Sequence, residues 1–439
     1  MENPQFYDMT RHPLLLVVLL ATFAYAYPQE RKVLVPAPPE VGGFSSARLA
    51  RLDSAMVDWV RNKWINGSVV LIARHGKIVF DKAYGYNDLV TKAPLDKNGI
   101  FRIASQTKAI TTVAALMLWE EGKFSMNDLV SKYIPSFAHA QVLASFNPKD
   151  SSYTTVPAKR QVTIHDLFTH TGGLGYPAIG TPEANAIYAK NYMTGGVGVK
   201  GQKLSDAMNR LGSLPLLYQP GEKWMYSLST DVLGYLVELW SGMNLEEFVE
   251  RRICGPLGMK DTWFNLPADK ASRLVNFFQE DSSGMHKQGS VFGGFLDMNF
   301  PLQKTEYFSG GGGLSSTVSD YAILLQMLLN GGEYNGVRLL ARNTVRMMTM
   351  NQIGDLTVNI GEGVGLNKWG LTFSIETEEG SKYVPSQVGT YGWGGVFSTS
   401  YWVDPKEDML VLIYRQIWGP HVGLTNQAFM PLVYQAIND

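Results

Sequence analysis

Strand-like segments lie near both ends of this chain and helix-like segments fill its middle, and this arrangement constrains the fold most. Residues 68–73 and 77–80 are apolar, and the three residues between them are typical of a hairpin turn. Further strand patterns occur at 370–376, 391–403 and 409–415. A sheet assembled from such distant segments implies an α/β (α+β) fold, with an antiparallel sheet flanked by helices and a helical sub-domain inserted into it.

Three helices are predicted with clear boundaries. Residues 45–60 carry apolar side chains at helical spacing after a serine cap. Residues 109–118 are apolar on nearly every face, which is typical of a buried helix, and Gly122 provides its stop. Residues 426–437 are expected to form a closing helix, in which Pro431 marks a kink or the first turn.

The first residues have the pattern of an export signal. Arg11-His12 precede the apolar run 14–20, and Ala24-Tyr25-Ala26 fits a small-x-small cleavage site. We therefore expect a signal peptide at 1–26, a Pro-rich linker at 27–43 and an exported (periplasmic or secreted) protein, with no stable membrane span after cleavage. The apolar run is short for a membrane span, and a retained anchor is the alternative.

Composition excludes several classes of function. The chain has 439 residues, of which 18% are charged, and a formal net charge of -1, so no nucleic-acid partner is expected. Cys254 is the only cysteine, which excludes a disulfide framework and a cysteine-rich zinc site. We predict no metal and no organic cofactor.

Ser105-Gln106-Thr107-Lys108 is the only Ser-x-x-Lys in the sequence. Residues three apart on a helix share a side, so the Lys108 amine can reach the Ser105 hydroxyl. A serine needs a base to become a nucleophile, and a lysine can serve if burial keeps it neutral. Free N–H groups at the helix start would favour developing negative charge. The plainer interpretation is that Ser105 only caps the helix.

Two further segments complete a candidate constellation. Tyr226 lies where a loop runs into a helix, a place from which its hydroxyl could point into a cleft, although simple packing is the default for one tyrosine among 21. Trp393-Gly394-Gly395 lies in a glycine-rich strand, 391–397, and glycines in a strand allow close approach to the backbone or mark a bulge.

Three other patterns are decoys. Residues 196–201 fit G-x-G-x-x-G but follow a helix-like stretch, so we predict a mobile loop rather than a dinucleotide site. His165 and His170 have the wrong spacing for one helical face and are predicted to be structural. No G-x-S-x-G elbow is present, which argues against an α/β-hydrolase with a histidine base.

Taken in this order and at these separations, the three segments resemble the serine β-lactamase and penicillin-recognising family, and within it the class C β-lactamase-like branch. Framework segments at 167–174 and 312–317 add to the resemblance, which covers the chain from about Phe44 to Asp439. The resemblance implies a β-lactamase/transpeptidase-like catalytic domain at 44–439. Its sheet sub-domain would comprise 44–104 plus 308–439, and its helical sub-domain 105–307.

The same resemblance assigns roles to individual residues. Ser105 would be the nucleophile, Lys108 its partner base and Tyr226 the first residue of the second motif. The oxyanion hole would be the backbone N–H groups of Ser105 and Val396. The third motif would fall on Trp393-Gly394-Gly395, beside the substrate.

Two departures from the β-lactamase pattern distinguish between members of the family. Trp393 replaces a lysine that helps hold the drug's carboxylate, and Leu228 replaces an asparagine that binds its side-chain amide. A carboxylate that meets an apolar wall loses a charge-assisted bond worth about 1.5–3 kcal/mol. Lys368 and Arg415 are cations whose positions the sequence leaves open. The sequence is most similar to the family VIII carboxylesterases, and related acyltransferases carry similar residues.

The resemblance thus implies a serine hydrolase that cleaves carboxylic esters through an acyl-enzyme on Ser105, with a small-molecule ester or acyl compound as substrate. A β-lactamase or a D-amino-acid peptidase or acyltransferase that uses the same nucleophile is the main alternative. A non-catalytic sensor of acyl compounds or peptidoglycan is a lesser one. Acyl chain length and oligomeric state are not determined by these patterns.

Overall fold

The computed structural model describes residues 1, 32–294, 296–359 and 365–439, and residues 32–439 form one compact unit. The predicted signal peptide lies, apart from Met1, outside the described residues. Among the helices of the described part, none is both long enough and apolar enough to cross a bilayer.

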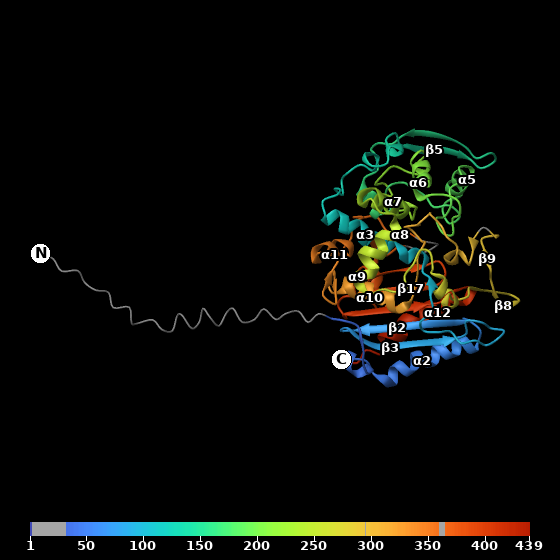
Figure 1. Cartoon of the computed structure of the whole chain (residues 1–439), viewed down its shortest axis with the longest axis vertical. Helices are drawn as coiled ribbons and strands as arrows, with labels where there is room; N and C mark the ends of the chain where they lie inside the picture. The colour runs from blue at the N-terminus through green and yellow to red at the C-terminus, as the bar shows by residue number, and fades with distance from the viewer. Residues whose placement is uncertain (2–31, 295, 360–364) are drawn as a thin grey trace. The chain divides into compact units, whose positions relative to one another are not determined.

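An eight-stranded sheet is built from both ends of the chain, as the sequence predicts (Figure 1). Its strands, in spatial order, are β1 (Val35–Pro36), β3 (Lys77–Gly85), β2 (Gly67–Arg74), β18 (Met409–Tyr414), β17 (Thr399–Asp404), β16 (Tyr391–Gly395), β15 (Ser374–Ile375) and β14 (Lys368–Trp369). All neighbours pair antiparallel except β1 with β3. The sheet is therefore mainly antiparallel, which is the arrangement that the family resemblance implies.

Helices cover both faces of this sheet, which explains why its central strands are apolar throughout. Every residue of β2 and of β18 is buried. Val70 and Ile72 belong to an apolar cluster with α2 (Ser46–Arg61) and α12 (Pro420–Tyr434), while the alternate residues Val69 and Leu71 face the larger core. Strands that are buried on both faces read as continuous apolar runs.

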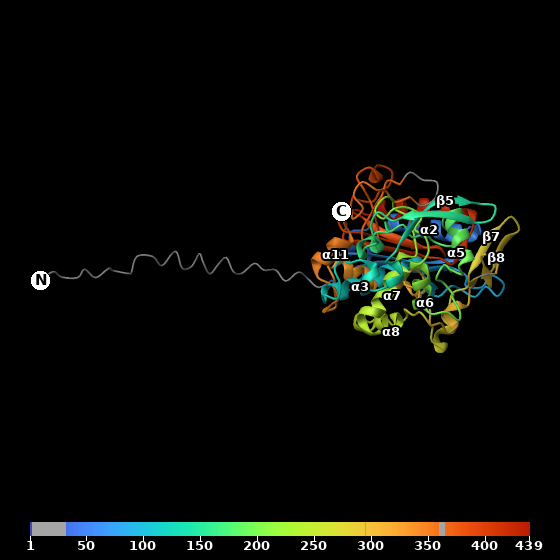
Figure 2. The same ribbon diagram turned by 90° about the horizontal axis from the view of Figure 1, so that it is seen from above.

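The helical part lies on the side of the sheet opposite α2 (Figure 1), and Figure 2 shows it from above. Its helices are α3 (Thr107–Glu120), α4 (Ile164–Phe168), α5 (Pro182–Lys190), α6 (Leu204–Gly212), α7 (Ser229–Ser241), α8 (Leu245–Val249), α9 (Gly255–Leu257), α10 (Val318–Leu329) and α11 (Arg342–Met348). Residues 107–118 of α3 are all buried, and α3 packs against α7. The predicted buried helix is thus the centre of this layer.

Several elements differ from the sequence prediction. The first part of the predicted linker that the structure describes is not free, because β1 adds to the sheet edge. The hairpin of β5 (Gln141–Asn147) and β6 (Ser152–Pro157) was not expected, because β6 is exposed throughout and shows no buried, alternating face. Residues 391–403 form two strands joined by a tight turn, and not one strand. The closing helix begins at Pro420, before its predicted start at residue 426.

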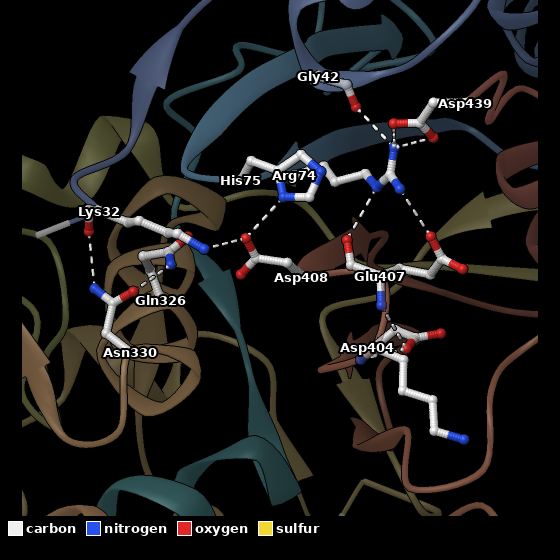
Figure 3. Close-up of polar contacts among 11 residues, drawn as sticks. Lys32, Gly42, Arg74, His75, Gln326, Asn330, Asp404, Glu407, Asp408 and Asp439 are labelled. Atoms are coloured by element: carbon white, nitrogen blue, oxygen red, sulfur yellow. Dashed lines mark hydrogen bonds and ion pairs between the residues drawn. The ribbon is translucent and has the colours of Figure 1, made fainter. Parts of the chain in front are cut away.

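Charged side chains link both ends of the described unit, residues 32–439, to the sheet (Figure 3). The Arg74 guanidinium, whose side chain is 8% exposed, donates to Glu407 at 2.9 Å and to Asp439 at 2.7 Å. Lys32, at the start of the described unit, pairs with Asp408 in the β17–β18 turn. We call Arg74, Glu407, Asp439, Lys32 and Asp408 the terminal ion cluster.

Candidate active site

Ser105 lies in a 3-10 turn, η2 (Ala104–Gln106), that leads directly into α3. Ser105 itself is partly exposed, whereas Ala104 and Gln106 are buried. The turn is fixed at Gln106, whose carbonyl accepts a hydrogen bond from Tyr321 at 2.8 Å and whose side-chain oxygen accepts one from Tyr414 at 2.5 Å. Ser105 is therefore the one residue of this turn that is not buried.

The residue before Ser105 has a strained backbone. Ala104 has φ +44°, in the left-handed region that a residue with a Cβ seldom adopts. Such strain persists only where the surroundings determine it, and it gathers at functional sites. The sequence carries no signal for it, because an alanine at this position suggests an ordinary helical start.

Lys108 is 1% exposed and reaches toward the start of α3. Its Nζ donates to the Gly311 carbonyl at 2.7 Å and stands 4.5 Å above the Tyr226 ring centroid and 5.6 Å above that of Tyr176. Carbonyl oxygens and aromatic faces both attract a cationic amine. In the described part of the chain, no hydrogen bond joins the Ser105 hydroxyl to Lys108 or Tyr226. Catalytic hydrogen bonds are often long before a ligand binds.

Tyr226 brings the second and third predicted motifs together. Its ring stacks on Tyr176, with centroids 5.7 Å apart and planes at 6°. Its hydroxyl accepts a hydrogen bond from the Trp393 indole at 3.4 Å. Tyr226 precedes α7, which packs on α3, so the packing of two buried helices sets its distance from Lys108.

The glycines of β16 admit atoms of the protein itself. A Cβ at Gly395 would lie 2.4 Å from the Ile103 carbonyl, so this glycine lets β16 lie against the Ser105 turn. Gly394 pairs with Ser400 of β17 and has more room. Val396 follows at once, 43% exposed, and begins the turn to β17. The glycine-rich stretch thus brings the main chain of Val396 close to the turn that carries Ser105.

Three further side chains named from the sequence are buried or hydrogen-bonded to other groups: Leu228, which the resemblance placed at the substrate, and Lys368 and Arg415, whose positions the sequence left open. Leu228 is completely buried in the core, so its side chain offers no surface to a ligand. Lys368 donates to the Leu356 carbonyl at 2.8 Å. Arg415 is fully buried against Thr425 of α12, in the layer on the other face of the sheet. Neither cation replaces the missing lysine of the third motif.

Asp231 is a charged group of this centre that sequence reasoning missed. It is fully buried on α7, and its Oδ1 accepts a hydrogen bond from Ser309 at 2.6 Å. A Cβ at Gly311 would lie 2.4 Å from Asp231 Oδ2 and 3.4 Å from Lys108 Nζ, so both groups approach the same glycine. Burial raises the pKa of Asp231, while Ser309 and Lys108 oppose that rise. An aspartate five residues after Tyr226 in an apolar helix was the available signal.

The G-x-G-x-x-G decoy adopts neither helix nor strand and closes over Asp231. A Cβ at Gly196 would lie 2.7 Å from Ser309 Oγ and 2.9 Å from Asp231 Oδ1. Beyond it lies a narrow hollow lined by Gly196, Lys200, Phe300 and Tyr307 among others. The segment thus shields the buried carboxylate from water.

His170 is fully buried and packs beside Tyr226, with ring centroids 5.1 Å apart. Its Nδ1 shares a hydrogen bond with Ser227 Oγ at 2.9 Å. Burial lowers the pKa of His170 well below its usual range, and the Lys108 charge lowers it further. His165 lies elsewhere, 3.3 Å from Gln352 Oε1. Within the described ranges, no three potential ligand side chains lie close enough together to hold a metal.

Comparisons with known proteins agree with this geometry. A profile of the Beta-lactamase family matches residues 50–429. A Salmonella typhi protein that carries the provisional name D-alanyl-D-alanine carboxypeptidase is 31% identical, over 96% of this chain and 93% of its own. An uncharacterised Mycobacterium tuberculosis protein is 30% identical, over 80% of this chain and 86% of its own.

Solved structures show the same fold. EstCE1, described as a hydrolase with promiscuous acyltransferase activity, superposes with a TM-score of 0.74 at 26% identity, over 88% of this chain and 99% of its own. Simvastatin synthase from Aspergillus terreus also superposes with a TM-score of 0.74, over 89% of this chain and 98% of its own. At 23% identity, this second likeness bears on the fold alone.

Proposed function

Because this chain belongs to the Beta-lactamase family and is a serine hydrolase of that fold, we propose that its substrates are carboxylic esters. The ester would be cleaved in two steps, through an acyl-enzyme on Ser105. The class C-like branch and the carboxylesterase specificity are both part of this proposal.

In the first step, Ser105 Oγ attacks the ester carbonyl while its proton passes to the coupled pair of Lys108 and Tyr226. The carbonyl oxygen becomes an oxyanion, held by the backbone N–H groups of Ser105 and Val396. The C–O bond to the alcohol breaks, and the alkoxide takes the proton through Tyr226. Water then repeats the sequence on the acyl-enzyme and releases the acid. Proton transfer belongs to Lys108 and Tyr226 as a unit.

Asp231 supports this circuit without touching the ester. Its buried carboxylate lies beside Gly311, against which Lys108 also packs, and provides a fixed negative charge close to the amine. Such a charge favours the protonated amine that forms when Ser105 gives up its proton. Asp231 is therefore proposed as a positioning residue for Lys108.

The single observation that favours an ester over a β-lactam is the indole of Trp393 next to the Tyr226 hydroxyl. The position where a β-lactamase would offer a cation to the drug's carboxylate is aromatic here. Lys368 and Arg415 are bound elsewhere and cannot substitute without rearrangement. The likeness to EstCE1 supports the same preference and leaves acyl transfer to a second alcohol open.

A D-amino-acid peptidase is the second candidate, supported by the name of the Salmonella typhi relative. Its substrate ends in a carboxylate, which would meet the same aromatic wall. We rank it below the esterase for this reason. A non-catalytic sensor is the third candidate. The structure brings together Lys108, Tyr226 and Asp231, and this argues against a sensor, because a site without turnover does not require groups placed for proton transfer.

The deciding experiment compares p-nitrophenyl butyrate with nitrocefin, using the wild type, Ser105→Ala and the control Ser145→Ala on the exposed β5 strand. We expect a higher kcat/KM for the butyrate and a loss of about a thousandfold or more in Ser105→Ala alone. A preference for nitrocefin would establish the β-lactamase alternative. Failure of a fluorophosphonate to label Ser105 in the wild type would support the sensor.

Export belongs to this proposal as well. The sequence pattern at 1–26 suggests a cleaved leader, and a D-alanyl-D-alanine carboxypeptidase would act outside the cytoplasm. Mass spectrometry of the mature protein, together with cell fractionation, would test it: we expect a chain that begins near Tyr27 in the exported fraction. A full-length chain in the membrane fraction would indicate a retained anchor.

A further inference from the structure

Three apolar side chains are exposed together at the end of β16. Val396 is 43% exposed and Phe292 is 41% exposed, and Trp418 is partly exposed between them. Phe292 and Trp418 meet edge to face, with ring centroids 5.1 Å apart at 65°. We call Phe292, Trp418 and Val396 the apolar platform. Neighbouring apolar groups left open to water mark binding surfaces more often than scattered ones do.

The platform is continuous with the candidate active site. The Trp418 indole donates to the Val396 carbonyl at 2.5 Å, which fixes the same residue whose N–H is proposed for the oxyanion hole. Beneath the platform, Phe397 and Ala104 share one apolar cluster with Trp418. Ala104 is the residue before Ser105. A group resting on the platform would therefore lie beside the reacting hydroxyl.

Phe292 is held in this exposed position by its backbone. It has φ +53°, and Gly293 and Gly294 after it also have positive φ. A bulky side chain in the left-handed region is a conformational outlier. The ring meets Trp418 on one side and water on the other, so packing in the core does not account for the strain. A bound apolar group would cover the open face.

The position of Tyr226 indicates which half of an ester this would be. Tyr226, beside Trp393, returns the proton to the leaving alcohol in the proposed mechanism, so the alcohol lies toward Trp393. The platform begins three residues farther along the chain, at Val396, past the end of the strand. The acyl group, which points away from the alcohol across the carbonyl, would extend in that direction.

We propose that the apolar platform binds the acyl chain, and that the preferred substrates are esters of medium-length or aromatic acids rather than acetates. This inference rests on the proposed esterase function and deepens it. The occupant is the acyl chain of an acyl-enzyme on Ser105, whose far end would cover the open face of Phe292.

The test measures kcat/KM for p-nitrophenyl acetate and p-nitrophenyl octanoate, and follows the octanoate-to-acetate ratio in Phe292→Leu and Phe292→Ser. We expect the wild type to favour octanoate, and the ratio to fall stepwise, to about a third in Phe292→Leu and about a tenth in Phe292→Ser, as apolar contact is removed. Tyr153→Ala, an exposed aromatic residue on β6, is the matched control and should keep the wild-type ratio.

Trp418→Phe separates the ring from the N–H group. It keeps an aromatic face but loses the hydrogen bond to Val396, so we expect kcat for both esters to fall about two- to tenfold with the ratio retained. A ratio that is the same in the wild type and both Phe292 variants would overturn the platform proposal while leaving the esterase intact. Failure of the esterase proposal would give a different result: Ser105→Ala would be as active as the wild type.

Discussion

Two buried basic side chains in this molecule have opposite surroundings. Arg74 in the terminal ion cluster meets two carboxylates and two main-chain carbonyls, and both carboxylates reach solvent (Figure 3). Lys108 meets one carbonyl and two aromatic faces, while its nearest carboxylate, Asp231, is bound to Ser309. The Arg74 charge is neutralised by direct ion pairs with two carboxylates. The Lys108 amine has a carboxylate nearby, Asp231, but forms no direct ion pair with it. A group left without direct pairing can change its protonation state during a reaction.

The carboxylates of the two regions differ in the same way. Hydrogen bonding from Arg74 lowers the pKa of Asp439, so this group adds stability at neutral pH. Burial raises the pKa of Asp231, so ionising it inside the folded protein costs stability. One region therefore stabilises the fold with its charges, and the other maintains a charge at the expense of the fold.

The largest expected effect is on activity, and it distinguishes Lys108 from Arg74. Lys108→Met should lower kcat/KM for p-nitrophenyl butyrate by about a thousandfold, because the proton acceptor is lost. Arg74→Met should stay within about threefold of the wild type at 25 °C, since it lies far from Ser105. Equal losses in both variants would mean that Lys108 acts only through folding.

The same pair should separate in the reverse sense by stability. Arg74→Met leaves Glu407 and Asp439 without their partner, and we expect a loss of about 1–3 kcal/mol in the free energy of unfolding by urea. Partial exposure of both carboxylates keeps the loss below that of a fully buried pair. Lys108→Met keeps a chain of similar length against the two tyrosine rings and breaks no direct ion pair, so it should lose less than Arg74→Met.

Asp231→Asn should weaken catalysis and strengthen the fold. We expect about a tenfold lower kcat/KM, because the charge beside Lys108 is gone, and a gain of about 1 kcal/mol in unfolding free energy at pH 7. The folded pKa of Asp231 lies above the unfolded value, so wild-type stability falls as pH rises through that window. The stability difference between variant and wild type should therefore grow from pH 3.5 upward. A difference that is constant with pH would show that folding does not shift the pKa of Asp231.

The smallest effect is expected at the exposed chain end. Asp439→Asn removes one of the Arg74 contacts and should cost about 0.2–1 kcal/mol at pH 7. Because the folded pKa of Asp439 is lowered, this contribution is present above the unfolded value and disappears as pH falls through the folded one. Urea unfolding at pH 7 and pH 2.5 measures it, and the two proteins should converge at the lower pH.

The sequence was sufficient to predict the helices and strands whose buried residues follow a regular pattern. The apolar runs of β2 and α3 and the hairpin turn at His75 each follow from local pattern, and all three are present. The hairpin of β5 and β6 was missed because β6 is exposed throughout and β5 has a single buried residue, Val142, so neither strand shows an alternating pattern. The split of 391–403 was missed because the turn contains Phe397 and a left-handed Ser398 rather than glycine.

The candidate site was predictable where the reactive residue types occur in recognisable motifs. Ser105, Lys108, Tyr226 and Trp393 were predicted from motif order, and the structure gathers Lys108, Tyr226 and Trp393 around one point, next to the Ser105 turn. Asp231 was missed because its importance comes from burial next to Gly311, which is a property of tertiary packing. Leu228 was placed by family resemblance alone, and its burial could not be known without coordinates.

The Ser105 turn opens directly onto α3, the most deeply enclosed helix of the described chain. A hinge or an exposed edge could unfold locally while the rest of the molecule stays folded. This helix cannot, because the surrounding core packs against it. On heating, catalytic activity should consequently be lost at the same temperature at which the core unfolds, so that residual activity would report the folded fraction of the domain.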